Sequence, residues 1–406
     1  MQRRDFLQLG MDTVLGAAAL SAATPQVAPP QAKKLKVDGY SRHLQWLRTA
    51  DEVAEATIEM GFDGVDLTVR PYPGHVDPEK VAQDLPPFVN TLRKHGLQVI
   101  TITCPITDAD SPNAERILQT ASSLGITHYW WGTFRYEPGK PVMEQLEALK
   151  PRVAKLAALN SRYNMKAMYH TYSGASTVGA AIWDFLYVLR NFDPAQVSFH
   201  YDIGHMTNAG GNGTWALNLR AAGPYIGGVS AKDSVMERNL EVNGGGPYTP
   251  EMAAAAAAAG GGGRGRGGPG GAPGDGPGGP GGRGPGGRGA GAGGEASAGV
   301  PPGNGGRSGR GGGGGRGGAG GGGPASFPTW RVRQVPLGTG MVDLKQFGAV
   351  LKEINFSGPI EIQAEYPNGG AQNAQDRITL PRAQVLGAMK RDLIALREAF
   401  APSGLP

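Results

Sequence analysis

The sequence of 406 residues contains a single cysteine, Cys104, so a disulfide within the chain is excluded. Long apolar runs are also absent. The stretch MDTVLGAAALSAA near the N-terminus is short and interrupted by Asp12, so no membrane span is predicted. The segment GRGRGG at 263–268 fits a dinucleotide-binding pattern but follows no strand, so no nucleotide cofactor is expected.

The N-terminal segment has the layout of a signal peptide: a basic start, a short apolar middle and small residues near Ala23. Arg3-Arg4 followed by Phe6-Leu7 is typical of a twin-arginine signal. We therefore assign residues 1–31 to a signal and mature linker and predict export to the periplasm. The alternative is an ordinary basic N-terminus before a helix.

A low-complexity segment extends over residues 243–328. Residues 260–323 contain 38 glycines and almost no large apolar side chain, which predicts a disordered insertion. Seven arginines against Asp275 and Glu295 give this stretch five excess positive charges, equal to the net charge of +5 of the whole chain. No aromatic residues are interleaved with the arginines, so a nucleic-acid partner is not expected.

The remaining residues, 32–242 and 329–406, alternate between β-rich runs and helical patterns. Eight such strand–helix units predict an α/β fold, a (β/α)₈ TIM barrel in one domain, with the insertion between strand seven and helix seven. An open doubly wound sheet is the alternative. The predicted strands are 35–40, 64–69, 97–103, 126–131, 165–170, 197–202, 225–231 and 359–366. Among the helices, Ser111-Pro112 predicts the start of one over 111–125, and another is predicted over 176–191.

Polar side chains collect where these strands end. They are Asp66 and Arg70 after strand two, His170 after strand five, Asp202 and His205 after strand six, Lys232-Asp233 after strand seven and Glu365 after strand eight. A single Asp at such a position is commonly a helix cap, and a single His is commonly a core or surface residue. Because barrel active sites lie at the carboxyl ends of the strands, the whole set predicts a site there.

The ordered segments GFDGVDLTVR, YHTYSG, YDIGH, SAKD, PLGTGMVDL and GPIEIQAEYP resemble the xylose isomerase-like TIM-barrel family of sugar phosphate isomerases and epimerases. Ketose 3-epimerases, inosose dehydratases and hydroxypyruvate isomerases are among its members. The resemblance covers residues 35–242 and 329–400. It implies a small carbohydrate substrate.

The resemblance also implies a divalent metal site. Asp202 matches the ligand on strand six and Glu365 the ligand on strand eight, while His205 matches a residue that contacts substrate oxygen. Two positions depart from the family: His170 stands where a Glu is common, and Ser230 stands where a His ligand is expected. The remaining set of His170, Asp202, His205 and Glu365 would suit Mn²⁺, Zn²⁺ or Co²⁺.

Proton transfer between neighbouring sugar carbons passes through an enediolate, whose negative charge needs stabilisation by a metal, Arg70, Lys232 or a protonated His. Glu365, with a modestly raised pKa, is the expected general base. Glu365, His205 and Lys232 are therefore the predicted catalytic residues. The alternatives are a related sugar lyase or dehydratase and a non-catalytic carbohydrate-binding barrel.

Aromatic residues near the strand ends fit a sugar ligand. Trp131 and Tyr172 are predicted substrate contacts, although only one of Trp130 and Trp131 can face the interior because side chains alternate along a strand. Arg70 and His75 in the loop after strand two are predicted to bind an anionic or hydroxylated substrate group, with an ordinary salt bridge as the alternative.

Overall fold

Eight parallel strands close into a barrel in the computed structural model, which describes residues 35–174, 176–238, 241–242, 246–247, 330–366 and 374–405. The order around the barrel is β1, β12, β7, β6, β5, β4, β3, β2, which confirms the predicted (β/α)₈ barrel and excludes an open sheet. The barrel strands are β1 Val37–Tyr40, β2 Gly64–Thr68, β3 Gln98–Thr103, β4 His128–Trp131, β5 Lys166–His170, β6 Val197–Asp202, β7 Ile226–Ala231 and β12 Ile360–Ile362.

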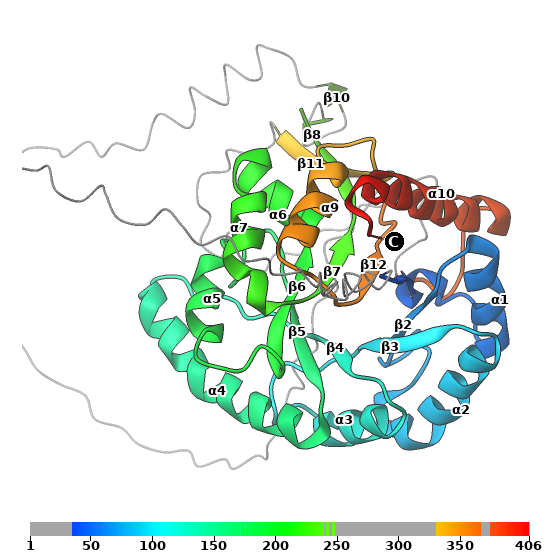
Figure 1. Ribbon diagram of the computed structural model, residues 1–406, viewed down its shortest axis with the longest axis horizontal. Coiled ribbons are helices and arrows are strands. Elements are labelled where there is room, and N and C mark those ends of the chain that lie inside the picture. Colours follow the sequence, from blue (N-terminus) through cyan, green and yellow to red (C-terminus); the bar gives the residue numbers. More distant parts are fainter. Residues whose placement is uncertain are drawn as a thin grey trace, which may run out of the picture. The chain divides into compact units, whose positions relative to one another are not determined.

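Helices surround the barrel and cover its apolar outer face (Figure 1). They are α1 Ala50–Met60, α2 Val81–Lys94, α3 Ala114–Ser123, α4 Val142–Tyr163, α5 Trp183–Leu189, α6 Ile203–Gly210, α7 Trp215–Ala222, α9 Leu344–Glu353 and α10 Arg382–Phe400. Helix α1 begins at a reciprocal cap between Thr49 and Glu52 and ends at Gly61, whose φ of 89° permits a left-handed turn. No helix among the described residues is long and apolar enough to cross a bilayer.

Two predicted helix starts are wrong. Helix α3 begins at Ala114 instead of Ser111, because the Ser111 hydroxyl accepts hydrogen bonds from the backbone of Thr107 and Asp108 and so tightens the preceding loop. Helix α5 begins only at Trp183, after turns that occupy most of the predicted first half. Both errors lie in loops that follow barrel strands, where local hydrogen bonds compete with helix formation.

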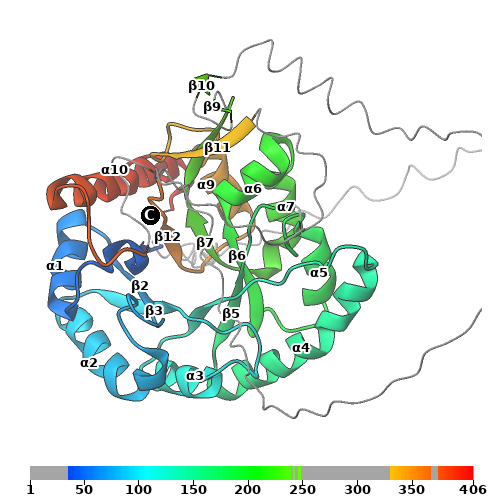
Figure 2. The same cartoon turned by 180° about the vertical axis from the view of Figure 1, so that it is seen from behind.

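An antiparallel ribbon continues from the C-terminal end of β7 (Figure 2). It pairs β8 Asp233–Arg238 with β11 Trp330–Val335, in a register that matches Arg238 with Trp330. A second pair joins β9 Glu241–Val242 to β10 Gly246–Pro247, so two residues predicted in the insertion form a short strand. The predicted signal segment 1–31 and nearly all of 243–328 lie outside the described residues.

Asp233 holds the loop between β11 and α9. Its Oδ2 atom accepts hydrogen bonds from the backbone nitrogens of Gly338 and Gly340 at 3.0 and 2.8 Å, and its Oδ1 atom accepts one from Val342 at 3.0 Å. The aspartate of the SAKD segment is therefore a structural residue that fixes the chain where it returns to the barrel.

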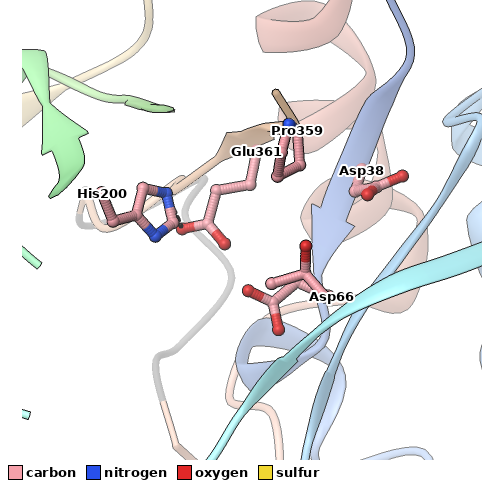
Figure 3. A pocket seen from close by; sticks show the side chains of 6 residues that line it. Asp38, Asp66, His200, Pro359 and Glu361 are labelled. Atoms are coloured by element: carbon pink, nitrogen blue, oxygen red, sulfur yellow. Dashed lines mark ion pairs between the residues drawn. The ribbon is translucent and has the colours of Figure 1, made fainter. Parts of the chain in front are cut away.

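A polar layer lies inside the barrel. Asp38, Asp66, Thr101, His200, Pro359 and Glu361 line a narrow cavity there, and Figure 3 shows His200 and Glu361 facing each other. Burial raises the pKa of Asp38 to about 8 and that of Asp66 to about 6, and burial together with Asp66 raises the pKa of Glu361 well above its usual value. Asp38 and Glu361 therefore hold protons at neutral pH, which limits the cost of burying their carboxyl groups.

Candidate active site

The side chain of Lys232 lies at the centre of the predicted site. Lys232 directly follows β7 and is 3% exposed. Four groups surround its ammonium nitrogen: His205 Nε2 at 2.8 Å, Asp202 Oδ2 at 3.1 Å, and Glu365 Oε2 and Gln363 Oε1 both at 3.3 Å. These residues come from β6, the start of α6 and the segment after β12, so the ends of adjacent strands meet at one buried cation.

His205 is a neutral imidazole that accepts a hydrogen bond from Lys232. An ammonium group has only donors, so His205 Nε2 must be the acceptor and Nδ1 must carry the proton. That proton is donated to the hydroxyl of Ser173, 3.0 Å away. Burial, reinforced by the charge of Lys232, lowers the pKa of His205 to about 3. His205 therefore positions the ammonium and does not carry a charge of its own.

Asp202 has two separate tasks. Its Oδ1 atom accepts a hydrogen bond from the His205 backbone at 2.9 Å and so caps helix α6. Its Oδ2 atom faces Lys232 and lies 3.4 Å from His170 Nε2. Burial would raise the pKa of Asp202, but Lys232, together with His205 and His170, outweighs burial and holds the pKa well below its usual value. The capping role and the site role therefore coexist in one carboxylate.

Glu365 is ionised, contrary to the predicted rise in its pKa. Burial alone would raise the pKa, but the ammonium of Lys232, together with His43 and His205, lowers it to about 2. The amine responds in the opposite sense: burial would lower the pKa of Lys232, and the carboxylates of Asp202 and Glu365 raise it above its ordinary value. Lys232 is thus a permanent cation, suited to stabilising negative charge and unsuited to acting as a base or nucleophile.

Trp130, not Trp131, faces the barrel interior. The Trp130 ring stacks on His170 at 4.1 Å between centroids and on Tyr40 at 5.1 Å, and so forms an aromatic floor beneath the site. Trp131 packs between strands and helices against Tyr169 and Phe185, and its Nε1 donates to the Thr107 carbonyl at 2.8 Å. The predicted substrate contact through Trp131 is therefore wrong, because its side chain lies on the outer face of β4.

The other predicted contacts divide between the site and the scaffold. The Tyr172 ring lies against His170 at 4.3 Å and His205 at 5.0 Å, at the edge of the site. Arg70 has its Nε atom buried without a hydrogen-bond partner in the described part of the chain. His75 does not join them: its two ring nitrogens contact Thr68 Oγ1 at 2.8 Å and the Leu44 carbonyl at 3.2 Å.

Gln363 was missed from the sequence. Its amide oxygen accepts from Lys232, and its amide nitrogen donates to Glu361 Oε1 at 2.6 Å. Gln363 therefore links the ammonium to the polar layer inside the barrel. The sequence feature that indicates a role for Gln363 is its position two residues before Glu365, because residues i and i+2 share a face in an extended segment.

The sequence model of a protein family, the xylose isomerase-like TIM barrel, matches residues 54–258, half of the chain. The chain belongs to this family. No match was found among curated proteins.

Solved structures show the same fold. A search finds the IolI protein with a bound zinc atom at 12% identity, covering 90% of this chain and 100% of that chain with a TM-score of 0.54. D-psicose 3-epimerase from Clostridium cellulolyticum H10, with D-tagatose, has 11% identity, 90% and 99% coverage and a TM-score of 0.52. An L-ribulose 3-epimerase has 13% identity, 91% and 95% coverage and a TM-score of 0.50.

The metal site implied by the family resemblance does not fit the residues present. The lysine ammonium occupies the point at which Asp202, His205 and Glu365 converge, and the strand-seven position is Ser230, whose buried hydroxyl has no partner in the described structure. Within the described ranges no three His, Cys, Asp or Glu side chains are grouped so that they could hold a metal ion. The predicted ligands are brought together, but around an ammonium.

Proposed function

We propose that this chain is an exported sugar isomerase or epimerase that moves a proton between neighbouring carbons through an enediolate. One observation carries the proposal: a permanent buried cation, Lys232, lies 3.3 Å from an ionised carboxylate, Glu365, at the carboxyl ends of the barrel strands. Membership of the xylose isomerase-like family and the fold shared with sugar epimerases support the substrate class.

The proposed reaction begins with the sugar carbonyl oxygen next to the ammonium of Lys232. Glu365 removes the proton from the adjacent carbon, and the electrons of that C–H bond form the enediolate, whose oxygen accepts a hydrogen bond from Lys232. As the ammonium turns from Glu365 to the new oxyanion, its attraction for the carboxylate weakens, so Glu365 holds the proton more readily.

The fate of the proton sets the product. Return of the proton from Glu365 to the neighbouring carbon isomerises the sugar. Epimerisation instead needs a second acid or a water molecule to deliver a proton to the opposite face of the original carbon, while Glu365 keeps the proton that it removed. If the neighbouring carbon carries a leaving group, the same enediolate expels that group, which gives the lyase alternative. Tyr172 and Arg70 would contact the sugar hydroxyls at the edge of the site.

The test is exchange of carbon-bound hydrogen in D₂O, followed by NMR on a panel of ketoses, aldoses and sugar acids. Exchange reports proton removal even when the equilibrium product is not known. Glu365→Gln is expected to abolish exchange, while Lys155→Met, at an exposed ion pair with Asp110, should leave it unchanged. A protein that binds sugars but exchanges no hydrogen from any of them would instead be a carbohydrate-binding barrel.

A further inference from the structure

Three residues of the YDIGH segment are arranged around the Lys232 side chain. Asp202 supplies a carboxylate and His205 supplies a neutral acceptor. Gly204 supplies space: a Cβ atom at this position would lie 2.6 Å from Lys232 Cγ and 2.9 Å from its carbonyl oxygen. A glycine is therefore required here for the lysine stem to reach the centre of the site.

Ser230 lies where the family resemblance implies a metal ligand. It lies on β7 two residues before Lys232, in register with Asp202 on β6 and Glu361 on β12. A hydroxyl group is a poor ligand for a transition metal, and the buried Ser230 hydroxyl has no partner among the described residues. The strand position at which the family resemblance implies an imidazole ligand therefore contributes no ligand here.

The charges also favour a single cation. The carboxyl groups of Asp202 and Glu365 are both paired with the ammonium, and His205 Nε2 is occupied by a hydrogen bond from the same group. A divalent ion bound to these ligands would lie beside the buried ammonium of Lys232. Repulsion between the two positive charges in a site of low dielectric constant opposes that arrangement.

We propose that the ammonium group of Lys232 replaces a divalent metal ion in this member of the xylose isomerase-like family, so that the protein has no stoichiometric metal. The inference rests on the proposed function for the role of the ammonium, which is to stabilise the enediolate oxygen. No redox step or added reactant is required, because the ammonium acts only through charge and hydrogen bonds.

The test is metal binding measured without substrate. The full-length protein, purified without a metal-affinity tag, is dialysed against Mn²⁺, Zn²⁺ or Co²⁺ and its metal content is determined. Less than about 0.1 equivalent is expected for the wild type. The variant Ser230→His/Lys232→Met restores an imidazole and removes the cation, and is expected to bind about one equivalent. Ser230→His alone is the matched control and should remain metal-free.

Proton exchange provides the second measurement. A chelator should leave wild-type exchange unchanged, and Lys232→Met should slow it by about 100-fold or more, the size of effect seen when a charge-stabilising donor is removed. One equivalent of tightly bound metal in the wild type, lost in Asp202→Asn, would overturn the inference. So would a folded double variant, verified by circular dichroism, that binds no metal. A metal-free wild type without any exchange would count against the proposed function and leave the metal result standing.

Discussion

The Nζ atom of Lys232 lies 2.8 Å from Nε2 of His205, and this contact fixes the chemistry of both side chains. The imidazole must accept, so it is neutral and its other nitrogen carries the proton. The ammonium is held between this acceptor and two carboxylates. A site that sequence similarity describes as metal-binding is therefore organised around a lysine.

Asp202→Ala should destabilise the fold, because Asp202 both caps α6 and neutralises Lys232. We expect a loss of about 3–5 kcal/mol in the free energy of unfolding, since the buried ammonium loses a partner. Asp343→Ala is the matched control: Asp343 caps α9 in the same way but is exposed, so only about 1 kcal/mol should be lost. Denaturant unfolding measures both. Equal losses in the two variants would mean that the ion pair contributes nothing.

Asp38→Asn should stabilise the protein more at pH 8 than at pH 5. The pKa of Asp38 is about 8 in the fold, against an ordinary value of 3.8. Between these values the unfolded chain has released the proton and the folded chain retains it, so stability falls as pH rises. The advantage of Asn over Asp should grow by a few kcal/mol across this range, roughly 1.4 kcal/mol per pH unit at most. Denaturant unfolding of the wild type and Asp38→Asn at pH 5 and pH 8 measures this, and an equal difference at the two pH values would contradict it.

Trp130→Phe should mainly slow proton exchange, whereas Trp131→Phe should mainly lower the stability of the fold. Replacing Trp130 removes part of the ring stacked on His170, so we expect proton exchange to slow by about tenfold through misplacement of the site. Replacing Trp131 removes a hydrogen bond to Thr107 in the outer core, so we expect about 1–3 kcal/mol of stability to be lost with exchange retained. Exchange rates and melting temperatures of both variants measure these effects. Slower exchange in Trp131→Phe but not in Trp130→Phe would contradict the assignment of the two faces.

Deletion of residues 243–328 should preserve the barrel and its activity. Arg238 and Trp330 are paired in the β8–β11 ribbon, so the deletion would leave residues 239–242 and 329 to connect them. A loop of this length is common in β-hairpins. We also expect proteolysis to remove the segment without lowering the melting temperature of the remainder. A drop of several degrees after trimming or deletion would show that the segment belongs to the domain.

Export should depend on Arg3 and Arg4. The pair Arg3→Lys/Arg4→Lys is expected to retain the precursor in the cytoplasm of a bacterial host, whereas Gln8→Ala in the same segment should be exported. Fractionation followed by mass determination of the N-terminus measures this. Export of the double-lysine variant, or export in a host without the twin-arginine translocase, would contradict the predicted route.

The sequence by itself determined the barrel and predicted a candidate site at the carboxyl ends of its strands. Alternating strand and helix patterns predict the fold, and Asp202, His205, Lys232 and Glu365 follow strands whose carboxyl ends must lie at one end of a barrel. These conclusions need only local patterns, because parallel strands all place their carboxyl ends at the same end of the barrel.

Only the tertiary structure decided which aromatic faces the site and which cation fills it. Both faces of a parallel barrel strand are buried, so hydrophobicity does not distinguish the side of Trp130 from that of Trp131. The ammonium position depends on space at Gly204 and on carboxylates from β6 and from the segment after β12. The pKa of Glu365 then falls instead of rising, because its value is set by a charge on the neighbouring strand that is distant in the sequence.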